Sequence, residues 1–338
     1  MKRKLLCLGL CLLLTLGLAG CEAKPAEEAE RLDFSGVQVE QLKTYEEPRS
    51  SLRGLTASAD GAYLYGGFIK GAPRGVYKID AQTGEDVWYY QDQGYSQPGF
   101  CKGVAVDDRG YVYVGVTTWE QDGELQLAVL NDETGEEISL TPISAIGKVG
   151  TNGVAVRKDG DKYLLYLITN YNVNTVRCYD VTDVNAPTVY QDFAMDGVMD
   201  IPALTKSDFA EGTALAFAGD GSFYMTANLG NGSKGDSVLH ISGDGKNILS
   251  QTALNEAYGL ELYGEYLFVS TYLEGTSSVH VLNAADLKEL AEVGNLPDCT
   301  QYTGVVFRNG KLYISDQSFE DGSRILVSTE IGCEPSGK

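Results

Sequence analysis

One recurrence constrains the fold of this chain more than any other feature of its sequence. A glycine that opens a short apolar stretch is followed, five to nine residues later, by a second glycine in a tight turn. The opening glycines, 49, 50, 59, 47 and 45 residues apart, are Gly54, Gly103, Gly153, Gly212, Gly259 and Gly304. Turns between twisted strands favour glycine because it readily adopts a positive φ. The repeat therefore predicts a series of similar β-hairpins.

The second repeat shows what one unit contains. Residues 102–141 comprise a short apolar strand, an alternating Tyr-Val strand at 111–114, a third strand at 125–130 and a fourth at 136–141. Four short antiparallel strands in about 40 residues are typical of one blade of a β-propeller. Six copies predict an all-β, six-bladed propeller with four-stranded antiparallel blades, forming one domain over residues 33–338.

The last repeat lacks a fourth strand. Only three strands follow Gly304, whereas residues 34–46 contain an alternating strand without a neighbour in sequence. If this N-terminal strand became the outer strand of the sixth blade, it would close the ring and cover an exposed edge. We therefore predict closure by the N-terminal strand.

The first 32 residues lie outside the repeats. Residues 1–20 combine a basic start with an apolar stretch, Leu5 to Leu18, too short to span a bilayer, which is typical of a secretory signal peptide. The following Leu-Ala-Gly-Cys ending at Cys21 resembles the lipobox of bacterial lipoproteins, which implies acylation of Cys21. Residues 21–32 would then be a lipidated tether, placing the domain at the extracytoplasmic face of the cell membrane. The alternative is an ordinary signal peptide cleaved at a small residue.

Charge and cysteine content exclude some functions. A formal net charge of −21 argues against nucleic acid as a partner, because binding phosphates requires a basic surface. Beyond the signal peptide and Cys21, the cysteines are Cys101, Cys178, Cys299 and Cys333, without the spacing of a zinc site. We expect Cys178 to be a buried free thiol.

The pattern of glycine, apolar strand, Asp-Gly turn and aromatic strand resembles NHL and YVTN-type propeller repeats and the SMP-30/gluconolactonase-like group. The resemblance covers residues 54–329. Such folds host both enzymes and binding modules, so the fold does not decide the function. Sites in these rings usually lie on the face bearing the loops before each first strand and between each second and third strand. We call it the loop face.

The residues directly before the six glycines would reach that face: Arg53, Lys102, Asn152, Glu211, Tyr258 and Thr303. The SMP-30 resemblance implies Asn152 and Glu211 as ligands of a divalent cation, and hence a metal-dependent hydrolase of the lactonase type. The Glu-Gly-Pro expected at another blade is absent, and Arg53 and Lys102 would compete with a cation for nearby carboxylates. Ordinary polar loop ends are the alternative.

Bulky residues recur between the second and third strands. Five of the six are aromatic: Phe68, Trp119, Tyr171, Tyr272 and Phe319. Exposed on one face, they would form, with Arg53 and Lys102, a binding surface for a glycan, peptide or protein ligand. Buried between blades, they would be core.

Other features give no catalytic residue. The two histidines, His240 and His280, lie at matching places in third strands, which favours packing over the loop-borne role that a streptogramin-lyase-like enzyme would need. The turns at 80–85 and 131–136 resemble those of quinone-cofactor propellers, but the Trp-rich packing of that group is missing. The apolar insertion at 194–212 is expected to pack over the channel mouth. We favour a membrane-anchored ligand-binding lipoprotein without a cofactor.

Overall fold

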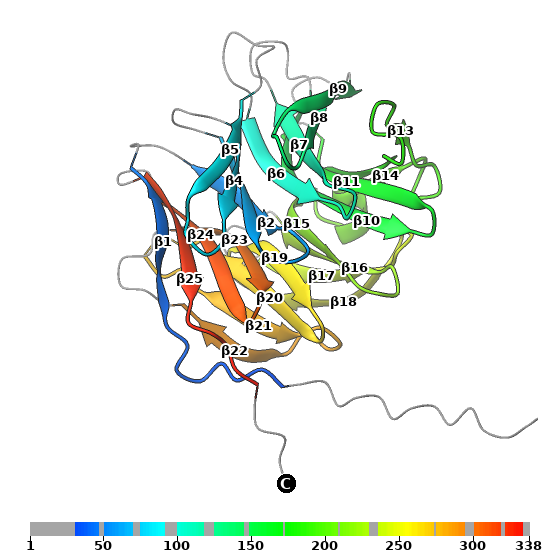
Figure 1. The fold of residues 1–338 in the computed structure, drawn as a ribbon. Helices are drawn as coiled ribbons and strands as arrows, with labels where there is room; N and C mark the ends of the chain where they lie inside the picture. The colour runs from blue at the N-terminus through cyan, green and yellow to red at the C-terminus, as the bar shows by residue number, and fades with distance from the viewer. Residues whose placement is uncertain are drawn as a thin grey trace, which may run out of the picture.

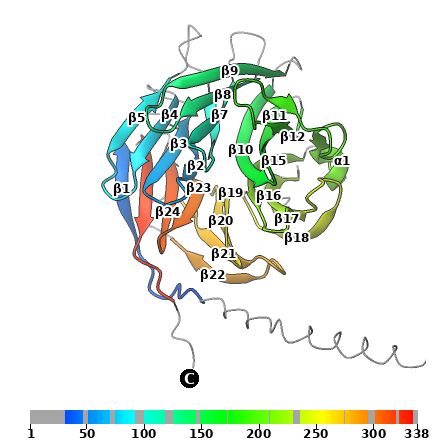
Figure 2. The ribbon, with the colours of Figure 1, turned by 45° about the vertical axis from the view of Figure 1, so that its right-hand side comes forward.

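A computed structural model describes residues 31–46, 51–69, 75–91, 100–117, 125–144, 149–171, 173–208, 210–229, 236–273, 275–294, 301–318 and 322–333. The predicted fold is confirmed: six antiparallel sheets form the six blades of a β-propeller (Figures 1 and 2). The first strand of each blade lies innermost, and strands two to four follow outward.

The first three blades come from residues 52–189. Blade 1 comprises β2 (Leu52–Ala57), β3 (Tyr63–Phe68), β4 (Gly75–Asp80) and β5 (Asp86–Tyr90). Blade 2 comprises β6 (Phe100–Val106), β7 (Tyr111–Thr117), β8 (Leu125–Asn131) and β9 (Glu137–Ser144). Blade 3 comprises β10 (Val149–Asp159), β11 (Lys162–Tyr171), β12 (Thr175–Asp180) and the short β13 (Thr188–Val189).

Residues 211–328, together with the N-terminal strand β1, supply the other three. Blade 4 comprises β15 (Glu211–Phe217), β16 (Phe223–Asn228), β17 (Asp236–Ile241) and β18 (Ile248–Ala253). Blade 5 comprises β19 (Ala257–Tyr263), β20 (Tyr266–Thr271), β21 (Val279–Asn283) and β22 (Glu289–Val293). Blade 6 comprises β23 (Gln301–Arg308), β24 (Lys311–Ser318), β25 (Gly322–Ser328) and the N-terminal β1 (Val39–Tyr45).

Closure by the N-terminal strand is also confirmed. β1 pairs with β25 antiparallel from Val39 opposite Ser328 to Tyr45 opposite Ser323, as Figure 1 shows at the blue and red ends of the ring. Phe34 and Val39 pack against the buried residues between blades 5 and 6, and Tyr45 packs against those between blades 6 and 1. β1 thus contributes both hydrogen bonds and apolar burial to the ring.

The opening glycines have a packing reason. Most of them face the inner strand of the next blade so closely that a Cβ atom would meet its backbone: at Gly54, 2.5 Å from the Lys102 carbonyl oxygen, and at Gly103, 2.5 Å from the Val154 nitrogen. The same holds for Gly304, whose Cβ would lie 2.8 Å from the Leu55 nitrogen and so completes the circle. The inner strands meet backbone to backbone around the axis, and glycine is the residue that permits this approach.

The insertion at 194–212 packs differently from our expectation. Its β14 (Val198–Asp200) pairs with β12 and leads into the short helix α1 (Ile201–Thr205). Met199 and Ile201 are buried between blades 3 and 4, whereas Met195 is exposed. The prediction that this segment covers the channel mouth is therefore wrong for Met199 and Ile201, which complete the core beside the short outer strand β13. Phe209 lies outside the described residues.

Cys178 on β12 is a buried free thiol, as predicted. Burial raises the pKa of this thiol to about 12, so it is protonated at neutral pH. Within the ranges given above, no helix is long and apolar enough to cross a membrane.

Candidate functional site

The inner strands surround a central channel with a volume of about 380 Å³. Its middle is lined by small and aliphatic residues such as Ala105, Ala155 and Leu260. Lys102, Asn152 and Tyr258 line its loop-face end, so the strand-opening residues from separate blades gather there. Figure 2 shows the inner strands of several blades around this axis.

Irregular strand geometry accompanies these side chains. The inner strand of every blade has a shift in register close to its opening glycine. In blade 1 the shift lies between Arg53 and Leu55, and in blade 6 between Tyr302 and Gly304. A β-bulge bends the strand and re-aims the neighbouring side chain. The repeated bulge is what allows side chains next to buried inner strands to meet one another at the channel mouth.

We call the residues that meet there the mouth cluster: Arg53, Lys102, Asn152, Asn170, Glu211, Tyr258 and Tyr272. One half centres on Arg53, which donates to the hydroxyls of Tyr258 at 3.0 Å and Tyr272 at 2.9 Å. The two tyrosine rings stack with centroids 5.1 Å apart, and the guanidinium carbon lies 4.7 Å from the Tyr272 centroid. Gln317 donates to the Tyr272 hydroxyl at 2.6 Å and so fixes this ring from blade 6.

The other half centres on Asn152. Its carboxamide oxygen accepts from the Lys102 ammonium and from Asn170, both at 2.7 Å, while its nitrogen donates to Glu211 at 2.7 Å. Burial lowers the pKa of Lys102, and the Arg53 charge acts in the same direction, whereas Tyr258 and Glu211 oppose it. Lys102 thus lies within electrostatic range of both halves of the cluster.

Asn170 leaves one hydrogen-bonding group without a partner. This residue is 3% exposed, and its side-chain oxygen has no donor although its nitrogen is bonded to Asn152. A buried polar atom without a partner costs free energy, which a ligand donor could recover. The mouth cluster therefore offers both donors and an unsatisfied acceptor.

The geometry also bears on the metal-ligand hypothesis. Asn152 and Glu211 are adjacent, as the resemblance implied, but the Asn152 oxygen that would bind a cation accepts from the Lys102 ammonium. A cation at this point would have to displace that positive charge. The donor set as arranged suits an anion better than a divalent metal.

The predicted aromatic surface is found only in part. Phe68 is 2% exposed and packs edge to face against Tyr45 and Tyr77, so its assignment to a ligand surface is wrong; it fills the core between blades 6 and 1. Tyr272 belongs to the mouth cluster. Trp119, Phe319 and the side chain of Tyr171 lie outside the described residues.

The histidines are not equivalent, contrary to our interpretation. Blades 4 and 5 can be aligned on the register shift between their third and fourth strands. In that alignment His240 of blade 4 takes the position of Val281 in blade 5, and His280 of blade 5 takes the position of Leu239 in blade 4. His240 stacks on Tyr224 with centroids 4.4 Å apart, a packing role as predicted. His280 lies on the other face of its sheet, where Nδ1 is 2.6 Å from Glu289.

Sequence reasoning missed Asn170 and Gln317, and it did not assign Tyr258 to a site. Tyr258 had a usable signal, since it precedes an opening glycine like Arg53 and Lys102. Asn170 and Gln317 lie at the ends of second strands β11 and β24, and their positions relative to the channel depend on the bulges rather than on a motif.

Comparison with solved structures agrees with the fold. A Thermus thermophilus protein assigned as an oxidoreductase (glucose dehydrogenase) matches with a TM-score of 0.59 and 15% identity, over 87% of this chain and all of that chain. A PQQ-bound aldose sugar dehydrogenase from Streptomyces coelicolor matches with a TM-score of 0.59 and 15% identity, over 88% of this chain and 98% of that one. The Dos1 propeller matches with a TM-score of 0.50 and 12% identity, over 84% and 80%.

No protein-family model and no curated protein matches the sequence. At these identities the structural likeness shows the propeller fold and nothing finer.

Proposed function

We propose that this protein is a binding protein whose propeller takes up an acidic saccharide at the mouth cluster, with its charged group against Arg53 and Lys102. In this proposal, a lipid on Cys21 holds the domain at the extracytoplasmic face of the membrane. The ring then serves as a rigid frame for a single polar site on its loop face.

The observation that carries the proposal is the state of Arg53. The guanidinium is half-buried between two tyrosines, and no carboxylate among the described residues pairs with it. A partly desolvated cation without a counter-ion favours an anionic ligand, and guanidinium matches a carboxylate in bidentate geometry. In a chain of net charge −21 this is a local exception to the overall sign.

The surroundings favour a saccharide as the bearer of that anion. Stacked aromatic rings such as Tyr258 and Tyr272 suit the apolar faces of sugars, and the unpaired side-chain oxygen of Asn170 could accept from a sugar hydroxyl. An acidic peptide would also supply a carboxylate to Arg53, so it is the competing ligand in the screen that follows.

The experiment is a binding screen with uronate-bearing oligosaccharides, their neutral counterparts and acidic peptides, followed by calorimetry. We expect binding of the uronates to weaken at least tenfold in Arg53→Met and in Lys102→Met, because each variant removes a charge-assisted bond worth about 1.5–3 kcal/mol. The matched control is Lys288→Met, which changes an exposed lysine on a turn between outer strands. Equal binding of neutral and acidic sugars, or preference for the peptides, would contradict the proposal.

The hydrolase alternative predicts a different result. A lactonase-type enzyme would bind calcium, zinc or manganese through Asn152 and Glu211, and Glu211→Gln would abolish that binding. The contact between Lys102 and Asn152 is the reason that we place it second.

The proposal does not extend to the sugar oxidation named for two of the similar structures. Sugar oxidation requires a base that removes a hydroxyl proton. The two histidines of the chain lie on the third strands β17 and β21, apart from the mouth cluster. Glu211 is the carboxylate of the mouth cluster, and it accepts a hydrogen bond from Asn152.

A further inference from the structure

The outer half of blade 5 carries a group of side chains that the proposed binding site does not use. His280 on β21 lies directly opposite Glu292 on β22, and a register shift follows between Val281 and Leu282. Residues three apart on a regular strand point to opposite faces, but the extra residue Leu290 places Glu289 opposite Leu282, on the His280 face. The bulge thus brings one imidazole and two carboxylates together.

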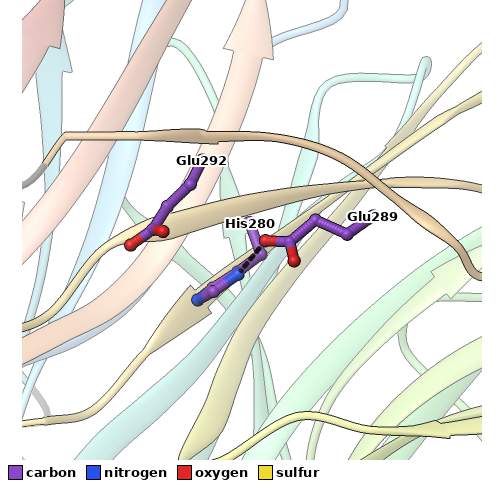
Figure 3. A group of neighbouring side chains, drawn as sticks. All are labelled: His280, Glu289 and Glu292. Atoms are coloured by element: carbon purple, nitrogen blue, oxygen red, sulfur yellow. Dashed lines mark hydrogen bonds and ion pairs between the residues drawn. The ribbon is translucent and has the colours of Figure 1, made fainter.

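Figure 3 shows the imidazole of His280 between the two carboxylates. One potential ligand atom from each residue lies within 4.8 Å of the other two, and Nδ1 is 2.6 Å from the Glu289 oxygen. The second ring nitrogen, Nε2, lies 3.2 Å from the Ser278 hydroxyl, and this hydrogen bond restrains the orientation of the ring. Hydrogen bonds to the outer nitrogen orient histidine ligands in metal sites.

We propose that His280, Glu289 and Glu292 bind a divalent transition-metal ion, with zinc as the best fit. One nitrogen and two carboxylate oxygens form a ligand set used by zinc, whereas calcium and magnesium prefer oxygen alone. Three protein ligands leave the fourth tetrahedral position for water. The site lies on the outer strands β21 and β22 of blade 5, separate from the mouth cluster at the end of the channel.

The geometry needs only a small adjustment. Ligand atoms in a tetrahedral zinc site are about 3.3 Å apart, so the contact between His280 and Glu289 would have to open slightly. The Glu289 side chain is 53% exposed and the His280 side chain 17%, so the glutamate is free to move around a more fixed imidazole. An ion would also neutralise two neighbouring carboxylates and join the outer strand β22 to β21.

The repeat itself does not generate this group. In blade 4 the bulge-aligned positions hold Leu239, Ile248 and Gln251, none of which is a strong metal ligand. Among the residues that the structure describes, His280, Glu289 and Glu292 form the one set of three His, Cys, Asp or Glu side chains with metal-binding spacing.

The test uses the whole purified chain, stripped with a chelator and dialysed against zinc, with metal analysis and X-ray absorption as readouts. We expect one zinc per chain, bound through one imidazole and oxygen ligands, that excess magnesium and calcium do not displace. His280→Gln should weaken binding at least 100-fold and Glu292→Gln at least tenfold. The matched control is His240→Gln, which changes the other histidine on the opposite face of a neighbouring blade and should bind zinc like the unaltered chain.

Several results would overturn the proposal. These are zinc bound at much less than one ion per chain, equal loss in His240→Gln and His280→Gln, or sulfur ligands in the absorption spectrum. Loss of zinc in Glu211→Gln with retention in His280→Gln would move the ion to the mouth cluster and support the hydrolase alternative instead. Circular dichroism of each variant distinguishes lost binding from lost folding, and Glu292→Gln, on an exposed surface, gives a second variant if His280→Gln unfolds.

Discussion

At the scale of single residues, the opening glycines allow the ring to close tightly around its axis. The channel is narrow because neighbouring inner strands approach with no side chain between them at these points. A methyl group at Gly103 would lie 2.5 Å from the Val154 nitrogen and 2.8 Å from the Gly153 carbonyl carbon, atoms that belong to the backbone of the next blade. Backbone cannot move aside as a flexible side chain does.

Gly103→Ala should therefore lower the free energy of unfolding by about 2–4 kcal/mol, because blades 2 and 3 must separate to accept the methyl group. Gly219→Ala is the matched control, since a Cβ there meets nothing within 4 Å and its φ is not positive, and it should change stability by less than about 0.5 kcal/mol. Urea denaturation of both variants measures the difference. Equal stability of the two variants would mean that blades 2 and 3 can accept a methyl group at Gly103 without separating.

At the scale of elements, β1 joins the start of the chain to its end. It supplies the fourth strand of blade 6, and its side chains enter the core on both sides of that blade. Without it, β25 would be an exposed edge and two clusters of buried residues would open to water.

Deleting residues 33–46 should lower the melting temperature of the whole domain by about 10 °C or more, because the ring loses both its closing strand and part of two cores. Differential scanning calorimetry gives the measurement, and a chain beginning at Arg31 is the control, since it retains β1. A melting curve like that of the control would show that β1 is an addition to a ring that is already closed.

The sequence predicts these elements well because the turns are local and repeated. Gly103 and the Asp-Gly turns mark where strands begin and reverse, and the unmatched strand at 34–46 could pair in only one place. Side-chain direction is harder to predict. His240 and His280 occur in similar strings, yet one residue of offset relative to the bulge places them on opposite faces. Phe68 fits the pattern of bulky residues between second and third strands, but its side chain is buried in the core. Asn170 meets Asn152 at the bulge between Thr151 and Gly153, which no sequence motif marks.

At the scale of the whole molecule, the start of the described chain and the mouth cluster lie on opposite faces of the ring. Loops before the inner strands lead to the mouth cluster, while the described chain begins on the opposite face, where Leu32 bridges Cys333 and donates to the Tyr266 hydroxyl. A membrane tether arriving there would leave the mouth cluster directed away from the bilayer.

Cys21→Ser should move the protein from the membrane fraction to the soluble extracytoplasmic fraction, because the lipid would have no attachment site. Fractionation with immunoblotting measures this, and Cys178→Ser, which changes a buried thiol, is the control for loss of a cysteine. Membrane retention of Cys21→Ser would contradict the proposed anchor.

The pairing of β1 with β25 has a mechanical consequence. A force that pulls the residues before β1 outward from the face on which Leu32 lies would act along the length of the strand. The hydrogen bonds that join residues 39–45 of β1 to β25 run perpendicular to that direction. The force would therefore load all of them together in shear instead of opening them one at a time. A domain tethered in this way would resist force at the strand by which its ring is closed.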